Sequence, residues 1–429
     1  MKKLNVFYSG WGEHWQLGTL AQAGTTTLFE YTPLAIERNL VLSPIHHPLP
    51  HASGAVSSFK GSTAFHGLPG FIADALPDGW GMLLMDRALR QAGRDPRTVS
   101  VIERLALIGH SAVGALSFEP SEETMLPGEV LQLSALIRDV RKFLAQDRRD
   151  GEPGEAGTNA ILQQLLRLGG SPQGARPKVL VDFNPRTGAM SSGLPRRGAM
   201  RPWLVKFPAP PEHREVSALE QLYALFARCG GIEMPISKCF EVGKQHSAFG
   251  VSRFDRVVAG TAPDLRVPMV SLGGLLEADH RIPSLDYESY LLATLRLTGD
   301  QREVRKAFER CVFNVLMHNR DDHARNFAYV RNRQGHWVLS PAFDLTFSNG
   351  PGGEHSTSVA GHGKQITRAH LLRVAKIGGI KLKDAEHSID HWRNLGAKLT
   401  TLAKSLPIRR ATLARVFAHV SAQGLLLQA

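Results

Sequence analysis

The chain has 429 residues, and its 51 Lys and Arg outnumber its 39 Asp and Glu, which gives a formal net charge of +12. At ~150 residues per domain, this length corresponds to two or three domains. Hydrophobic residues make up 43% and charged residues 21% of the chain, a globular mixture that excludes wholesale disorder, a collagen-like repeat and a disulfide scaffold.

The cysteines indicate a reducing compartment. Cys229, Cys239 and Cys311 are an odd number in a long chain and show no C-x-x-C spacing, which argues against a structural zinc site. The apolar stretch near the N-terminus covers only residues 4–8, shorter than the roughly 7–15 residues of a secretory signal. No later stretch reaches the ~18 apolar residues of a membrane span. We therefore expect a soluble, cytoplasmic protein with no membrane partner.

Residues 1–118 are predicted to form strands followed by helices. Alternating apolar residues predict strands at 4–8 and 26–31. The segment 68–81 is too rich in Pro and Gly for one helix, so we expect a structured loop that leads into a helix. Its acidic residues fit turn and cap roles better than a catalytic role.

The rest of the chain changes from strands to helices. Residues 147–158 form a polar, Gly- and Pro-rich linker. Strands are predicted at 178–182 and 203–207, and the turn-rich insert between them indicates a hairpin with a long loop. From about residue 284 the pattern is helical, and residues 304–316 carry apolar side chains at i, i+3, i+4 and i+7. Strands first and helices later predict an α+β fold with two lobes.

The positive charge is concentrated near the C-terminus. Residues 364–429 hold twelve Lys or Arg and only three Asp or Glu, so most of the net charge lies there. Such a segment is typical of a surface that faces nucleic acid or an acidic partner. A solvated helical face would have the same composition, and the sequence leaves both interpretations open.

The most informative segment is Asn319-Arg320-Asp321-Asp322-His323-Ala324-Arg325-Asn326, directly after the predicted buried helix. Two short predicted strands, 327–330 and 336–339, then form a hairpin. The chain continues to Asp344, so this residue and the segment are expected at the ends of the hairpin.

Phosphoryl transfer from ATP uses such residues. One carboxylate accepts the proton of the attacking hydroxyl, while an amide and a second carboxylate hold Mg²⁺ against the phosphates. In protein kinases, the catalytic Asp follows an Arg and precedes the metal-binding Asn by five residues. Arg320, Asp321 and Asn326 have this spacing, whereas Asp322 lies one residue too close. We assign Asp321 as the base, and Asn326 and Asp344 as Mg²⁺ ligands.

Two other interpretations of this segment are weaker. A zinc site is conceivable because His318 and His336 lie near His323, but no H-E-x-x-H or similar spacing is present. A single His beside acidic residues is more typical of a hydrogen-bonded support. The second alternative is that the segment is a capped turn without function. The order of helix, loop, hairpin and second Asp argues against this interpretation.

A kinase also needs a Lys on a strand and a Glu on a helix to hold it. A lone Lys in a strand usually decorates a sheet edge. Lys206, however, follows three apolar residues and precedes a predicted helix, which favours a phosphate-binding role. Glu220, beside the apolar face of that helix, is the candidate partner, and the spacing leaves Glu212 and Glu215 open as alternatives.

A phosphate loop and a hinge complete the predicted site. Residues 169–178 precede a strand and carry glycines whose backbone N–H groups could face phosphate. We expect three of its residues to contact the nucleotide: Gly170, Ser171 and Gly174. Phe254 and Asp255 follow another predicted strand, where a hinge between the lobes would offer backbone groups to adenine.

Five ordered motifs resemble those of the HipA serine/threonine kinase toxins of bacterial type II toxin–antitoxin systems. The resemblance covers nearly the whole chain and rests on these segments: Leu68-Pro69-Gly70…Asp74…Leu76-Pro77-Asp78-Gly79-Trp80-Gly81, Gly174-Ala175-Arg176-Pro177-Lys178, Arg253-Phe254-Asp255-Arg256, Asp321-x-His323-x-Arg325-Asn326 and Pro341-x-Phe343-Asp344-Leu345.

The resemblance implies a two-lobed, protein-kinase-like fold with an extra β-rich N-terminal subdomain and an all-helical C-terminal lobe. It implies a subdomain at 1–118, a nucleotide-binding lobe at 119–257 and a helical lobe at 258–429. It implies use of ATP and Mg²⁺, with His323 and Arg325 also at the nucleotide site, and autophosphorylation of Ser171, which ejects the phosphate loop and silences the kinase.

The resemblance also implies partners. Members of the family phosphorylate aminoacyl-tRNA synthetases, pair with a helix-turn-helix (HipB-like) antitoxin and bind operator DNA in that complex. Three positions depart from the family pattern: Arg325 replaces a Lys, Ser252 replaces a residue that is often acidic, and Gln173 replaces a frequent Gly. An Arg in place of a Lys keeps the charge but changes the hydrogen-bonding geometry.

Three hypotheses follow. The first is a protein serine/threonine kinase toxin with Asp321 as base. The second is a small-molecule phosphotransferase, because antibiotic phosphotransferases have a similar Asp-to-Asn spacing. The third is a catalytically quiet co-repressor that binds antitoxin and DNA, against which the complete set of Asp321, Asn326 and Asp344 argues.

Overall fold

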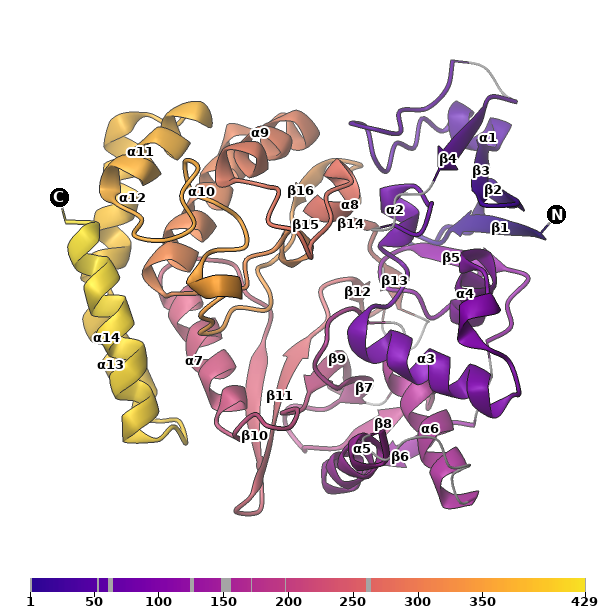
Figure 1. The fold of residues 1–429 in the computed structure, drawn as a ribbon, viewed down its shortest axis with the longest axis horizontal. Helices are drawn as coiled ribbons and strands as arrows, with labels where there is room; N and C mark the ends of the chain where they lie inside the picture. Colours follow the sequence, from indigo (N-terminus) through magenta and orange to yellow (C-terminus); the bar gives the residue numbers. More distant parts are fainter. Residues whose placement is uncertain are drawn as a thin grey trace.

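The computed structural model describes residues 2–51, 54–60, 65–123, 127–147, 156–170, 172–196, 198–259 and 264–428. Figure 1 shows three parts along the longest axis of the molecule. The N-terminal strands lie at one end, the central sheets and helices follow, and helices α11 to α14 lie at the opposite end.

The N-terminal subdomain is built on an antiparallel sheet with the strand order β4-β3-β2-β1-β5. Leu4, Val6 and Tyr8 are buried while their neighbours in β1 are not, so the predicted alternation at this strand is confirmed. The strands are β1 (Lys2–Tyr8), β2 (Trp15–Ala23), β3 (Thr26–Tyr31), β4 (Val56–Lys60) and β5 (Leu116–Glu119). The helices are α1 (Pro33–Glu37), α2 (Gly70–Ala73), α3 (Gly79–Gln91), η1 (Pro96–Thr98) and α4 (Val101–Ile108).

The central lobe contains a second antiparallel sheet, in the order β10-β11-β9-β7-β8-β6. Its strands are β6 (Glu129–Leu131), β7 (Lys178–Phe183), β8 (Met190–Ser192), β9 (Arg201–Lys206), β10 (Ser237–Val242) and β11 (His246–Ser252). Its helices are α5 (Leu133–Asp147), α6 (Ala156–Gly169) and α7 (Val216–Cys229). The predicted hairpin is confirmed, because β7 pairs with β9 and Lys178 lies opposite Lys206.

Two details of this lobe differ from the expectation. The insert of the hairpin contains β8, which pairs with the other edge of β7. Helix α6 begins at Ala156, inside the segment expected to be a linker, and residues 148–155 of that segment lie outside the described residues.

The C-terminal lobe is mainly helical but not all-helical. Its helices are α8 (Leu272–Leu276), α9 (Tyr287–Thr298), α10 (Gln301–Leu316), η2 (Ala324–Asn326), η3 (Pro351–Gly353), α11 (Arg368–Ile377), α12 (Leu382–Asn394), α13 (Gly396–Ala403) and α14 (Arg410–Leu426). The predicted hairpin of β15 (Ala328–Arg331) and β16 (Trp337–Leu339) gains a third strand, β14 (Met269–Ser271). A further pair, β12 (Arg256–Val257) and β13 (Leu265–Arg266), lies where the lobes join. None of the helices in the described part of the chain is long and apolar enough to cross a membrane.

Helix α3 joins the N-terminal subdomain to the rest of the molecule. Trp80 and Leu84 belong to the apolar core of the central lobe. Met85 and Leu89 belong to the other core, which continues from the N-terminal sheet into the C-terminal lobe. The N-terminal subdomain therefore packs against both lobes and shares its cores with them.

This packing predicts that Trp80→Ala destabilises the whole protein. Trp80 is 1% exposed, contacts Phe143 edge-on and donates from Nε1 to the carbonyl of Lys178 at 2.9 Å. Removing it should lower the free energy of unfolding by about 3–5 kcal/mol, measured by urea denaturation. Val130→Ala is the control, because Val130 is 70% exposed and should change stability by less than about 0.5 kcal/mol. Equal midpoints for the two variants would contradict the shared core.

Candidate active site

The centre of the candidate site is a cluster of three charged side chains. Lys206 ends β9, Glu220 lies on α7, and Asp344 follows the hairpin of the C-terminal lobe. The Nζ of Lys206 lies 2.6 Å from Oε1 of Glu220 and 2.5 Å from Oδ1 of Asp344. Three residues selected from the sequence are thus brought together where the two lobes meet.

The surroundings of Glu220 distinguish it from Glu212 and Glu215, the two alternative partners of Lys206. Glu220 is 2% exposed and faces Lys206, whereas Glu212 pairs with Arg176. Glu215 accepts from the backbone and side chain of Arg409, at the start of the last helix. Among the contacts that the structure describes, Glu220 is the only one of the three candidate partners that contacts Lys206.

The pKa shifts of Lys206 and Asp344 favour their charged forms, whereas burial raises the pKa of Glu220 above its ordinary value. Burial alone would lower the pKa of Lys206, but the carboxylates of Asp344 and Glu220 outweigh it and raise this pKa above its ordinary value. Burial alone would raise the pKa of Asp344, but the ammonium groups of Lys206 and Lys178 hold it well below its usual range. Lys206 is therefore a cation and Asp344 an anion at neutral pH.

The loop after α10 places two neighbouring carboxylates in opposite environments. Asp322 is 1% exposed, and its carboxylate accepts from the hydroxyl of Tyr287 at 2.7 Å and from the backbone of Ser356 at 2.8 Å. It also lies 2.7 Å from Nδ1 of His355. Asp321 has a side chain that is 52% exposed. Asp322 thus holds the loop together, and Asp321 carries the carboxylate that a substrate can reach.

Asp321 has an altered acidity. Desolvation by the surrounding protein raises its pKa above the ordinary value, and His323 opposes this rise. The negative charge of Asp344 raises it further, so the two carboxylates are close enough to interact.

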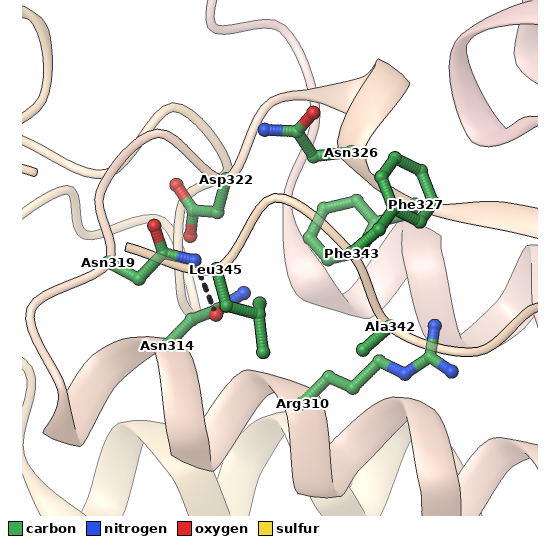
Figure 2. Close-up of a pocket in the computed structure, with 9 residues that line it drawn as sticks. All are labelled: Arg310, Asn314, Asn319, Asp322, Asn326, Phe327, Ala342, Phe343 and Leu345. Atoms are coloured by element: carbon green, nitrogen blue, oxygen red, sulfur yellow. Dashed lines mark hydrogen bonds between the residues drawn. The ribbon is translucent and has the colours of Figure 1, made fainter. Parts of the chain in front are cut away.

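Asn326 lies at the end of the same loop, in η2. Its Nδ2 donates to the carbonyl of Asp321 at 2.6 Å, which ties the two ends of the segment together. Figure 2 shows Asn326 beside a small cavity. The residues that line it are Arg310, Asn314, Asn319, Asp322, Asn326, Phe327, Ala342, Phe343 and Leu345. Among the described residues, no group of three His, Cys, Asp or Glu side chains is arranged to hold a metal ion.

The predicted phosphate loop lies between α6 and β7. Gly170 follows α6, and its N–H donates to the carbonyl of Leu166. Gly174 has a φ of +102°, a backbone conformation that favours glycine. Ser171 lies outside the described residues.

A second lysine, Lys178, lies opposite Lys206 on the neighbouring strand. Lys178 is 3% exposed, and its Nζ donates to the carbonyl of Gln173. Burial and the charge of Lys206 lower the pKa of Lys178 to about 8. The guanidinium of Arg176 lies 3.4 Å from Glu220. Arg176 and Lys178 both belong to the sequence motif at 174–178. Nothing in the pattern of the sequence predicted that they lie beside the Lys206 cluster.

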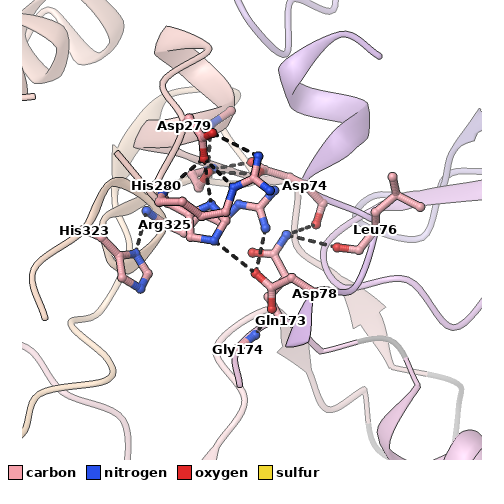
Figure 3. A network of polar contacts seen from close by, with 12 residues as sticks. Asp74, Leu76, Asp78, Gln173, Gly174, Asp279, His280, His323 and Arg325 are labelled. Atoms are coloured by element: carbon pink, nitrogen blue, oxygen red, sulfur yellow. Dashed lines mark hydrogen bonds and ion pairs between the residues drawn. The ribbon is translucent and has the colours of Figure 1, made fainter. Parts of the chain in front are cut away.

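His323 and Arg325 contact protein groups. Nδ1 of His323 accepts from the backbone of Arg325, and its ring lies against that of His280 with centroids 5.4 Å apart. Arg325 lies 2.7 Å from Oδ2 of Asp78, in the N-terminal subdomain (Figure 3). The structure thus gives Arg325 a partner that the sequence did not predict.

At the predicted hinge, the side chains of Asp255 and Phe254 contact other protein groups. Asp255 is 4% exposed, and its carboxylate accepts from Arg253 at 2.7 Å, Arg256 at 2.7 Å and the N–H of Gly114 at 3.0 Å. Burial alone would raise its pKa, but the two guanidinium groups hold it far below its usual range. The side chain of Asp255 therefore joins the N-terminal subdomain to the hinge. Phe254 packs against Phe343, with ring centroids 5.5 Å apart.

A sheet lobe with a buried Lys–Glu pair, joined to a mainly helical lobe with an Asp-to-Asn loop, defines a kinase-like fold. The HipA-like C-terminal domain model matches residues 170–406, and the HipA N-terminal domain model matches residues 4–119. The chain therefore belongs to the HipA family.

The solved structures that are similar to this chain include the following two. One, from Shewanella oneidensis MR-1, is the toxin antitoxin system HipA, HipB and its operator DNA complex. It has a TM-score of 0.70 and 16% identity, and the match covers 98% of this chain and 96% of that one. The other is the proinflammatory kinase CtkA of Helicobacter pylori, with a TM-score of 0.36, 11% identity, and coverage of 53% of this chain and 88% of that one. No curated protein matches the sequence.

The different surroundings of the two neighbouring carboxylates predict that substitution of Asp322 destabilises the protein and substitution of Asp321 does not. Asp322→Ala leaves buried donors of Tyr287, His355 and Ser356 without an acceptor, so it should lower the free energy of unfolding by about 3 kcal/mol or more. Asp321→Ala should change it by less than about 0.5 kcal/mol. Thermal and urea unfolding measure both, and equal losses would contradict this distinction.

Proposed function

We propose that this protein is an ATP- and Mg²⁺-dependent protein serine/threonine kinase. The observation that carries the proposal is the position of Lys206 between Glu220 of one lobe and Asp344 of the other. Phosphoryl transfer requires this combination, because catalysis depends on positioning and on stabilising charge. Asp321 and Asn326 follow on the adjacent loop.

Each residue has a role in this proposal. Lys206 binds phosphate oxygens, and Glu220 holds its ammonium group in place. The amide oxygen of Asn326 and the carboxylate of Asp344 are hard oxygen donors, which suit Mg²⁺. When bound, Mg²⁺ neutralises charge on the phosphates. Asp321 orients the substrate hydroxyl and accepts its proton.

The phosphate loop and the hinge complete the nucleotide site. We assign the backbone of Gly170 and Gly174 to phosphate binding, and the segment around Phe254 to adenine. Autophosphorylation of Ser171 remains part of the proposal and rests on the family resemblance. We also retain the proposed division of the chain at residues 1–118, 119–257 and 258–429.

The proposed biological role is that of a toxin neutralised by a helix-turn-helix antitoxin. The similar Shewanella protein is found in a complex with HipB and operator DNA, which supports a HipB-like partner and an operator for this chain. An aminoacyl-tRNA synthetase is the proposed substrate. Part of the excess charge near the C-terminus is used internally, because Arg373 pairs with Glu288 and Arg409 with Glu215.

The test compares the wild type with Asp321→Asn, both incubated with Mg-ATP and cell lysate. We expect the wild type to phosphorylate itself on Ser171 and one lysate protein on Ser or Thr, and the variant to lose at least about 100-fold of this activity. Phosphopeptide mass spectrometry identifies both sites. Asp384→Asn is the control, since Asp384 is a partly exposed carboxylate (41%) on α12 that pairs with Arg305.

Other outcomes separate the remaining hypotheses. Phosphate transfer to a small molecule alone would favour a phosphotransferase. No transfer by the wild type, together with tight antitoxin binding, would favour a co-repressor. Full activity of Asp321→Asn would exclude Asp321 as the base.

The pH dependence of the reaction gives a second test. A general base works only when deprotonated, and the pKa of Asp321 is raised. Activity should therefore fall as the pH decreases through a value above the ordinary aspartate pKa of about 3.9. Initial rates of autophosphorylation between pH 4 and pH 8, at saturating Mg-ATP, measure it. A midpoint at or below the ordinary value, with the protein still folded, would contradict the assignment.

A further inference from the structure

The segment that joins α2 to α3 lies against the predicted phosphate loop. The backbone N–H of Trp80 donates to the carbonyl of Gly174 at 3.1 Å. The side-chain amide of Gln173 donates to the carbonyls of Asp74 at 2.9 Å and Leu76 at 3.2 Å. Figure 3 shows the contacts of Gln173 with Asp74 and Leu76, which join two segments about a hundred residues apart in the sequence.

Two glycines of this segment allow the close approach. A Cβ on Gly79, which has a φ of +38°, would lie 2.7 Å from the Cα of Ala175. A Cβ on Gly81 would lie 2.8 Å from the carbonyl oxygen of Gly170. The backbone of 79–81 therefore packs against both ends of the segment 170–174, which explains why two glycines surround Trp80.

Asp78 connects this contact to the catalytic loop. Its Oδ1 accepts from the N–H of Gly174, and its Oδ2 lies 2.7 Å from the guanidinium of Arg325. The side chains of Asp78 and Arg325 are 24% and 9% exposed. Although Asp78 stands at the N-cap position of α3, its side chain makes no cap hydrogen bond. The cap role expected from the sequence is therefore not the role of this carboxylate.

The segment is also fixed to the C-terminal lobe. Asp74 accepts from the backbone of Ser271 at 2.6 Å and from its hydroxyl at 2.8 Å. A Cβ on Gly70 would lie 2.1 Å from the carbonyl of Gly274, so α2 and α8 are in direct contact. Asp78 is thus held by an anchored segment and connects two loops whose separation determines the shape of the nucleotide site.

We propose that Asp78 is a positioning residue that fastens the phosphate loop to the catalytic loop through Gly174 and Arg325. This inference rests on the proposed function, because the two loops are those that would bind ATP and catalyse its reaction. We call the three residues the Asp78 latch. In it, the N-terminal subdomain keeps the phosphate loop in the position that binds nucleotide, and Arg325 neutralises the carboxylate that would otherwise repel phosphate.

The structure offers a matched control. Asp86 lies on α3 and pairs with Arg104 at 2.7 Å, with a side chain that is 26% exposed. Its partner belongs to the N-terminal subdomain, so Asp86→Asn removes an ion pair of similar exposure that does not reach the phosphate loop. Asp78→Ala removes both contacts of the latch, while Asp78→Asn keeps an oxygen acceptor for Gly174 and loses the charge that faces Arg325.

The experiment measures Mg-ATP binding by calorimetry, steady-state kinetics and amide hydrogen exchange on the full chain. Asp78→Ala should weaken Mg-ATP binding and raise the KM for ATP by about tenfold or more, with kcat within about threefold of the wild type. Asp78→Asn should have a smaller effect in the same direction. Exchange in residues 172–178 should become faster in both variants, and Asp86→Asn should match the wild type.

A double variant tests whether Asp78 and Arg325 act together. If they form one latch, Asp78→Asn combined with Arg325→Gln should weaken Mg-ATP binding no more than the stronger single variant does. If the losses in Mg-ATP affinity of the two single variants multiply in the double variant, the proposed connection between Asp78 and Arg325 is wrong.

Other results would also overturn the latch. Unchanged or tighter nucleotide binding by a folded Asp78→Ala would show that the carboxylate is neutral or competes with phosphate. A lower kcat with an unchanged KM would indicate a general loss of structure. If the wild type itself binds no Mg-ATP, the proposed function is wrong, and hydrogen exchange at 172–178 still decides whether Asp78 holds the loop.

Discussion

The ion cluster of Lys206, Glu220 and Asp344 is the interaction on which the rest of the structure depends. A buried ammonium group is tolerated only when carboxylates compensate for the water that it has lost. One carboxylate comes from each lobe, so the charge balance of Lys206 requires the lobes to meet at this point. Every other component of the proposed site is arranged around this contact.

The N-terminal subdomain is part of this arrangement. Its helix α3 contributes to both apolar cores. Three of its polar contacts reach into the other lobes: Asp74 to Ser271, Asp78 to Arg325, and Gly114 to Asp255. Each uses a carboxylate that is largely withdrawn from solvent, and such charges destabilise a fold when their partners are removed. The subdomain is therefore an integral part of the kinase-like fold.

Local patterns predicted much of the fold and of the site. The alternation of Leu4, Val6 and Tyr8 predicted β1, and the apolar residues between 304 and 316 predicted the buried helix α10. The short strands β8 and β14 were missed, because three residues carry little periodicity and such strands are stabilised by their neighbours in the sheet. The C-terminal lobe was expected to be all-helical although its own hairpin had been predicted, and β14 completes a sheet there.

The sequence by itself showed which residue types occur at which spacing. This spacing selected Asp321 over Asp322 as the proposed base, and the predicted hairpin placed Asp344 near the segment 319–326. Tertiary structure decided which charges meet. It chose Glu220 over Glu212 and Glu215, placed the carboxylate of Asp255 against Arg256, and placed Asp78 against Arg325, 247 positions away in the sequence. The physical reason is that a buried charge is neutralised by whichever group the packing brings within about 3 Å, and packing depends on elements far apart in the chain.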